Sequence, residues 1–128
     1  MNANRKSAVI LVSATIVAIA ALSAASSGHT SKKGAPPSYK KVQAIFTAKC
    51  TKCHRGPKPP AQMNLESYAG TMKGNDDGAV VVAGKPENSL LYKLITTTGR
   101  KQMPPKQPLA KADVAVIQAW IKAGAKNN

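Results

Sequence analysis

Apolar residues recur at helical spacing in four stretches of the chain, and this pattern predicts an all-α fold. The first helix is expected to begin at Ser38, a good N-cap residue that follows two prolines, and to run directly into Cys50. Its apolar stripe is predicted to consist of Tyr39, Val42, Ile45 and Phe46.

The second and third helices are predicted to be short. Asn64 is expected to cap the second, which ends at Gly74 and carries Leu65, Tyr68 and Met72. Pro86 suits the first turn of the third helix. Its buried face is predicted to consist of Leu90, Leu91, Leu94 and Ile95. The run of valines at 80–82 is too short for a sheet and indicates an extended loop.

The last helix is predicted over residues 110–123 and should end at Gly124. Ala110 is a poor N-cap, which costs about 1 kcal/mol relative to a polar cap. Asp113, near the positive end of the helix, partly compensates. The apolar face is predicted to consist of Val114, Ile117 and Ile121, with Trp120 beside them.

The segment Cys50-Thr51-Lys52-Cys53-His54 contains the only two cysteines of the sequence and one of its two histidines. This C-x-x-C-H spacing is the attachment signature of a c-type haem. Each thiol can add across one haem vinyl group, and the residue after the second cysteine is then carried beneath the iron. The motif therefore predicts one covalently attached haem c, held by Cys50, Cys53 and His54. We expect this apolar plate to complete the thin core of so short a chain.

Three other interpretations of the motif agree less well with the sequence. A disulfide between Cys50 and Cys53 would close a tight, strained loop, and a thioredoxin-like pair would need a β-α-β pattern, which is not visible. Zinc needs four ligands, and the chain offers only these cysteines, His54 and the remote His29. His29 lies in residues 26–37, whose Ser, Gly, Pro and Lys content predicts a flexible linker.

Residues 1–25 have the features of an export signal. Arg5 and Lys6 precede an apolar run, and the small residues Ser23 and Ala25 permit cleavage after Ala25. The run also reaches the lower length limit of a membrane-spanning helix, although its Ala and Ser content favours a cleaved signal over an uncleaved anchor. We therefore expect a periplasmic protein, associated with the outer face of the cytoplasmic membrane only if the segment stays uncleaved.

The chain is strongly basic, with a formal net charge of +14 that cleavage after residue 25 would lower to +12. Such a charge favours acidic partner proteins, anionic lipid surfaces or nucleic acid. Export argues against nucleic acid, as does the small number of aromatic residues available for base stacking. A charge that serves solubility alone explains the composition equally well.

Several sequence features follow one another across residues 38–124: Phe46 four residues before Cys50, the C-x-x-C-H motif, Asn64-Leu65-Glu66-Ser67-Tyr68, residues 84–91, Met103-Pro104-Pro105 and residues 117–121. With these features the chain resembles the small class I cytochromes c, most closely the planctomycete-type cytochrome c domain. The resemblance implies a single all-α domain over residues 38–126, in which the first and last helices cross near Phe46 and Trp120. It also implies that His54 and a methionine are the two axial ligands of the iron.

Three methionines lie beyond the signal region, and Met103 is the predicted ligand. Met63 follows His54 by only nine residues, too few to pass comfortably to the other face of the haem. Met72 has the spacing of a core residue in a predicted helix. Met103 lies in a loop, residues 96–108, that two prolines stiffen, so its thioether can approach the iron from the distal side. The alternative is that Met103 belongs to the core and the iron site is open.

Two groups of basic residues flank the predicted haem loops: Lys49, Lys52, Arg55 and Lys58 near the cysteines, and Arg100, Lys101 and Lys106 near Met103. If both loops border the haem edge, as the resemblance implies, these cations form a positive collar. Such a collar would steer an acidic redox partner and accelerate association. Arg100 is also the candidate for neutralising a haem propionate.

These features predict an exported, monomeric one-electron carrier rather than an enzyme. With His and Met both bound, no substrate can reach the iron, and methionine raises the potential relative to a second histidine. The alternative is a haem electron-acceptor subunit docked on a larger exported oxidoreductase, which the sequence does not separate from a free shuttle. A peroxidase-like enzyme would need an open distal site with acid-base residues, and a haem sensor would need a displaceable ligand and an output domain. The sequence shows neither set of features.

Overall fold

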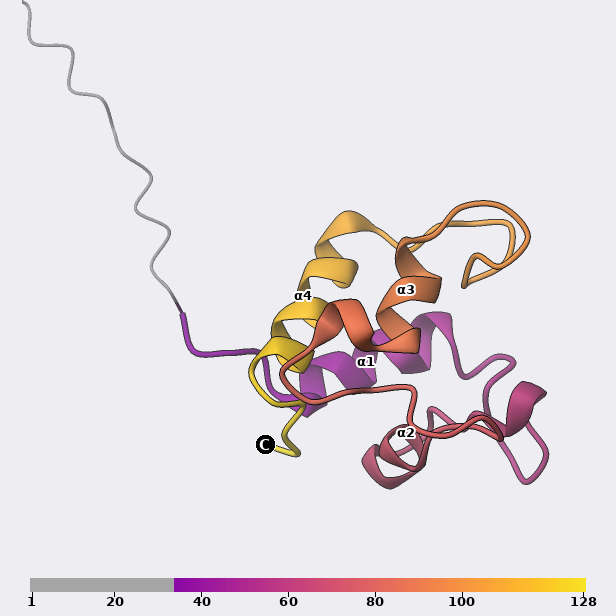
Figure 1. Ribbon diagram of the computed structural model, residues 1–128, viewed down its shortest axis with the longest axis horizontal. Helices are drawn as coiled ribbons and strands as arrows, with labels where there is room; N and C mark the ends of the chain where they lie inside the picture. Colours follow the sequence, from indigo (N-terminus) through magenta and orange to yellow (C-terminus); the bar gives the residue numbers. More distant parts are fainter. Residues whose placement is uncertain (1–33) are drawn as a thin grey trace, which may run out of the picture. The chain divides into compact units, whose positions relative to one another are not determined.

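The computed structural model describes residues 34–128, so the predicted signal, most of the predicted linker and His29 lie outside the described residues. The described residues form four α-helices and two short 3-10 helices and contain no β-strand. The elements are α1 (Tyr39–Lys49), η1 (Pro60–Gln62), α2 (Tyr68–Lys73), η2 (Pro86–Asn88), α3 (Leu90–Thr96) and α4 (Lys111–Lys122) (Figure 1). The prediction of an all-α fold is confirmed.

The core is built where α1 packs against α4 (Figure 1). The apolar stripe of α1 enters it, since Tyr39, Val42 and Phe46 are buried and Ile45 is half-buried. Phe46 is completely inaccessible to solvent, and its burial stabilises the fold by about 1.5–3 kcal/mol. From α4 the same core receives Ile117, Trp120 and Ile121.

The chain beyond α4 folds back on the helices and fixes Trp120. The indole Nε1 of Trp120 donates a hydrogen bond to the carbonyl of Lys126 at 2.8 Å, and its rings lie 5.5 Å from the Tyr39 ring. The hydroxyl of Tyr68 donates to the carbonyl of Ala125 at 2.9 Å. The last residues therefore bring the beginning of α1, the beginning of α2 and the end of α4 together.

The second helix begins later than the sequence predicts, because Ser67 and not Asn64 caps it. The Ser67 hydroxyl accepts a hydrogen bond from a backbone N–H of the first turn at 3.0 Å. The Asn64 side chain instead accepts from the N–H of Glu66 at 2.8 Å and closes a turn before the helix. The predicted end is correct: Gly74 has a positive φ, and a side-chain carbon there would collide with the carbonyl of Gly78.

The third helix is interrupted where the sequence predicts a continuous one. Pro86 opens η2, and α3 begins only at Leu90, because Ser89 between them is extended (φ −79°, ψ 119°). The buried Ser89 hydroxyl donates to the carbonyl of Lys85 at 3.0 Å and accepts from the N–H of Val82 at 2.9 Å. It thereby fixes the extended valine loop against the helix. Of the predicted apolar face, Leu91 and Ile95 are buried and Leu90 and Leu94 half-buried.

The fourth helix starts as weakly as predicted. No side-chain cap is formed by Ala110, and Asp113 lies in the first turn. Gly124 follows the helix with a φ of 100°, as expected of a terminating glycine. Within residues 34–128, no helix is both long and apolar enough to cross a membrane.

Candidate functional site

The predicted attachment residues lie in one hydrogen-bonded turn at the end of α1. The N–H of Cys50 donates to the carbonyl of Phe46 at 2.7 Å and so continues the helix. The N–H groups of Cys53 and His54 both donate to the carbonyl of Cys50, at 3.1 and 2.9 Å. The backbone alone therefore gathers Cys50, Cys53 and His54 at one place.

Both thiols of this turn are free, so the structure contains no disulfide between them. Cys50 is half-buried against the core, whereas Cys53 is exposed. Burial raises the pKa of the Cys50 thiol to about 11, which keeps it protonated at neutral pH. Among the described residues no group of three or more His, Cys, Asp or Glu side chains is arranged to hold a metal ion.

The imidazole of His54 is oriented by a backbone carbonyl. Its Nδ1 lies 3.1 Å from the carbonyl oxygen of Met63. Because a carbonyl can only accept, Nδ1 carries the proton and Nε2 is the nitrogen left to bind a metal. A metal-binding histidine almost always donates its other N–H in this way, which fixes its tautomer and raises its basicity as a ligand.

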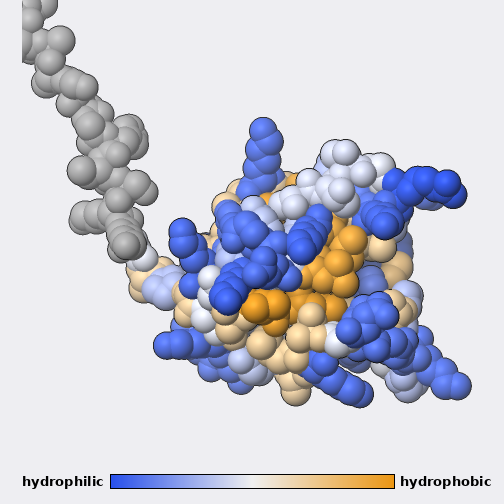
Figure 2. Space-filling model, in the orientation of Figure 1, coloured by the Kyte–Doolittle hydropathy of each residue, from blue (hydrophilic) through white to orange (hydrophobic). Residues whose placement is uncertain are grey.

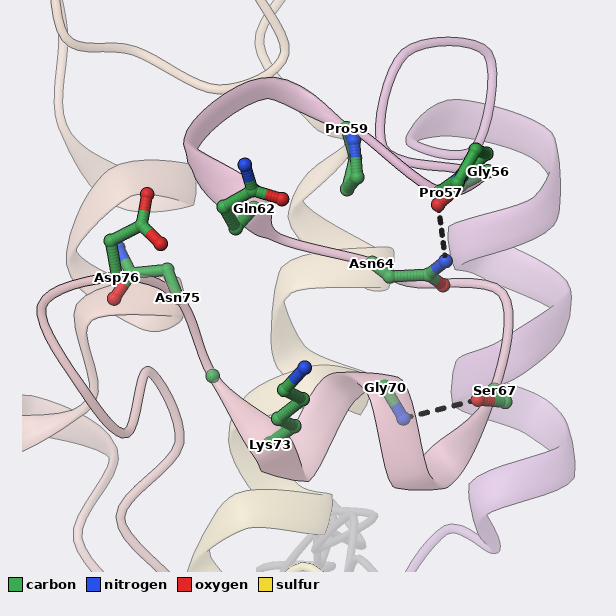
Figure 3. A pocket seen from close by; sticks show the side chains of 11 residues that line it. Gly56, Pro57, Pro59, Gln62, Asn64, Ser67, Gly70, Lys73, Asn75 and Asp76 are labelled. Atoms are coloured by element: carbon green, nitrogen blue, oxygen red, sulfur yellow. Dashed lines mark hydrogen bonds between the residues drawn. The ribbon is translucent and has the colours of Figure 1, made fainter.

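The loop after His54 is closed by polar contacts of its own. The N–H of Gly56 donates to the carboxylate of Glu66 at 2.9 Å, and the amide of Asn64 donates to the same oxygen at 3.1 Å. The Asn64 amide also donates to the carbonyl of Gly56 at 3.2 Å (Figure 3). The two hydrogen bonds to the Glu66 carboxylate hold the pKa of this carboxyl group below its ordinary value. The backbone N–H of Gly56 has the larger effect on the pKa, and the amide of Asn64 has the smaller one.

The second predicted ligand lies in the loop between α3 and α4. Met103 is half-buried against the core, and its N–H donates to the carbonyl of Leu94 at 2.9 Å, which ties the loop to α3. Met63 is buried, with 7% of its surface exposed, and Met72 is half-buried against the core. The assignment of Met103 as axial ligand stays a prediction.

Arg100 is exposed, and its role at a haem propionate also stays a prediction. The other cations of the predicted collar are exposed as well: Lys49, Lys52, Arg55, Lys58, Lys101 and Lys106.

The residues present fit a covalently attached haem. The turn offers two free thiols and an imidazole whose Nε2 can bind iron. Several apolar side chains at the edge of the core remain half-buried, and Figure 2 shows an apolar area bordered by hydrophilic side chains on the face in view. Those half-buried apolar residues include Ile45, Met72, Leu90, Tyr92 and Met103. A flat apolar group can cover apolar side chains of this kind and remove them from water.

A cavity of about 530 Å³ lies elsewhere, between the loop after His54 and α2 (Figure 3). Its lining is mostly polar and includes Gln62, Asn64, Lys73 and Asp76. None of the predicted site residues contributes to it, so we do not assign the haem to this space.

Sequence reasoning missed two groups of this loop: the Met63 carbonyl, which contacts His54, and the Glu66 carboxylate, which contacts Gly56 and Asn64. It considered Met63 only as a thioether, whereas the structure uses its backbone carbonyl, which every residue type possesses. It also assigned no role to Glu66. The position of Glu66, two residues after Asn64, was the available signal. An Asn side chain commonly closes a turn by accepting from the N–H two residues later, and a carboxylate at that later position can accept from the Asn amide in return.

Comparison with known proteins gives one match. Residues 50–107 match the family model described as Planctomycete cytochrome C. The matched segment begins at Cys50 and ends beyond Met103, so it contains every predicted site residue. No curated protein and no solved structure matches the chain.

Proposed function

From the membership of residues 50–107 in the planctomycete cytochrome C family, we propose that the protein is a one-electron carrier with one covalently attached haem c. A cytochrome c domain implies a haem-based electron carrier, and cytochromes c are typically electron carriers. The observation that best supports the proposal is the turn at residues 50–54, with its two free thiols and its oriented imidazole.

Haem, when bound, supplies one-electron exchange between ferric and ferrous iron. In the proposed site Cys50 and Cys53 would hold the group through thioether bonds, and His54 would bind the iron through Nε2. Met103 is proposed as the second axial ligand, on a loop that its own N–H anchors to α3. A filled second position would exclude substrates from the iron and leave electron exchange as the remaining chemistry.

The described residues offer little for an enzymatic alternative. His54 is the only histidine between residues 34 and 128, and it is the proposed ligand. A peroxidase-like reaction would need a second acid-base residue next to an open iron site. The proposed carrier needs none.

We further propose that the carrier is exported and serves an acidic redox partner. Export is inferred from residues 1–25, and the partner from the exposed cations on both haem loops. Charges of this kind raise the association rate more than they strengthen a complex.

Absorption spectroscopy and a redox titration of the purified protein test the proposal. We expect a low-spin spectrum in both oxidation states, the weak far-red band of a thioether bound to ferric haem, and a reversible one-electron transition. Rapid cyanide binding with turnover of hydrogen peroxide would instead identify an open, enzymatic site.

A further inference from the structure

We propose that Glu66 is a positioning residue for the iron ligand His54 and acts through the loop that joins them. The inference rests on the proposed function, because it takes His54 to be an axial ligand. It adds a carboxylate, distant in sequence from the C-x-x-C-H motif, that tunes the potential at which the carrier works.

The Glu66 carboxylate holds the two ends of this loop together. One of its oxygens accepts hydrogen bonds both from the N–H of Gly56, at 2.9 Å, and from the amide of Asn64, at 3.1 Å. Gly56 lies two residues after His54, and Asn64 lies directly after Met63. This side chain, together with the direct hydrogen bond from the Asn64 amide to the Gly56 carbonyl at 3.2 Å, ties the end of the loop next to His54 to the end that presents the Met63 carbonyl.

We call the contacts of the Glu66 carboxylate with Gly56 and Asn64 the Glu66 clamp. Two further contacts carry the effect of this clamp to the imidazole. The N–H of Leu65 donates to the carbonyl of His54 at 3.0 Å, and the carbonyl of Met63 accepts from the His54 ring at 3.1 Å. Because these groups flank Asn64 on both sides, a shift of Asn64 moves both contacts. The hydrogen bond at Nδ1 is the one that controls the basicity of the ring.

The base of the clamp is fixed to the first helix. The amide of Gln43 in α1 donates to the carbonyls of Leu65 and Glu66, at 3.2 and 3.1 Å. The same helix ends in the attachment turn. The backbone of Glu66 and the cysteines are therefore held by one rigid element, while the Glu66 side chain reaches the loop between them.

Solvent exposure does not remove this role. Glu66 is exposed, so the clamp adds little buried surface, and its effect lies in the position of the loop. Donation from Gly56 and Asn64 keeps the pKa of the carboxyl low, so the ionised form that accepts both bonds is present at neutral pH.

The consequence for the haem has a definite sign. A strong hydrogen bond from Nδ1–H to the Met63 carbonyl makes the imidazole more basic, and a more basic ligand favours ferric over ferrous iron. Loosening the clamp weakens this bond. The reduction potential should then rise.

The test compares Glu66→Gln with Glu87→Gln in the haem-loaded protein. Glu87 is an exposed glutamate of η2, so its substitution removes the same charge far from the loop in sequence. We expect Glu66→Gln to raise the reduction potential and to accelerate exchange of the His54 ring N–H by about two- to tenfold, the effect of weakening one ordinary hydrogen bond. Glu87→Gln should change neither quantity relative to the parent, and Glu66→Asp, which keeps the carboxylate, should return part of both changes.

Equal potentials and exchange rates in Glu66→Gln and Glu87→Gln would overturn the inference while leaving the carrier function intact. If the parent itself binds no haem covalently, or shows no low-spin spectrum, the proposed function fails first. A purely structural Glu66 would lower the unfolding temperature of Glu66→Gln without moving the potential of the folded protein, and that result also overturns the inference.

Discussion

Leucine substitutions at Met63 and Met103 separate the two roles that a methionine can have in this site. Leucine keeps most of the volume of methionine and removes the sulfur, so Met63→Leu and Met103→Leu are matched in chemistry. The two positions differ in burial. Met63 has 7% of its surface exposed and belongs to the core, whereas Met103 is half-buried at its edge.

Packing alone predicts that Met63 is the more sensitive position. A volume-conserving exchange in a core usually costs less than about 1.5 kcal/mol, and truncation of a buried methionine to alanine about 2–5 kcal/mol. Either value is a sizeable part of the roughly 5–15 kcal/mol that stabilises a domain. Met103→Leu should lose less packing, and the hydrogen bond from its N–H to Leu94 is a backbone contact that the substitution retains.

If Met103 is the iron ligand, the two positions should have the opposite order in their effect on the absorption spectrum, the reduction potential and the access of small ligands to the iron. Met103→Leu should abolish the far-red band, lower the reduction potential and admit cyanide or imidazole rapidly, since a thioether that favours ferrous iron is lost. Met63→Leu should keep the band and bind these ligands as slowly as the parent, even if denaturant unfolds it more easily. Our reasoning is refuted if Met63→Leu opens the iron site and Met103→Leu leaves it closed.

Three further predictions concern the attachment site, the surface and the core. Replacing both Cys50 and Cys53 by alanine should abolish haem that survives denaturing gel electrophoresis, and retention of haem by this variant would contradict attachment through the motif. Charge reversal at Lys52 and Lys101 should slow electron transfer to an acidic acceptor at low salt and have little effect at 1 M salt, where the Debye length is about 3 Å. A transfer rate that does not depend on salt would show that the positive charge serves solubility and does not steer a partner. Trp120→Phe removes the donor to the Lys126 carbonyl and should cost about 1–3 kcal/mol in denaturant unfolding, so an unchanged midpoint would show that this bond contributes nothing.

The helices of this fold could be predicted because their signals are local. The stripe from Tyr39 to Phe46 follows the period of a helix, and the structure buries it as that period requires. The poor cap at Ala110 and the stop at Gly74 were also readable, since each depends on the chemistry of one residue.

The boundaries that failed depend on a choice between equivalent residues. Asn64 and Ser67 are both good caps, and Ser67 caps the helix because the side-chain oxygen of Asn64 already accepts from the N–H of Glu66. Ser89 could equally have continued a helix from Pro86. It is not helical because its buried hydroxyl hydrogen-bonds to the N–H of Val82 and the carbonyl of Lys85. No local sequence pattern predicts these contacts.

The site itself shows why residue types reveal only part of such a centre. C-x-x-C-H identifies the atoms that can bind haem, but the orientation of His54 depends on a carbonyl nine residues away, supplied by Met63, whose side chain lies in the core. The same residue therefore links core packing to the imidazole, while Glu66 is the residue that we propose to act on the imidazole from the surface, through Gly56 and Asn64. A substitution in the core and a substitution at an exposed carboxylate can consequently both affect the proposed iron ligand, and denaturant unfolding distinguishes them, because only the core substitution also removes buried packing.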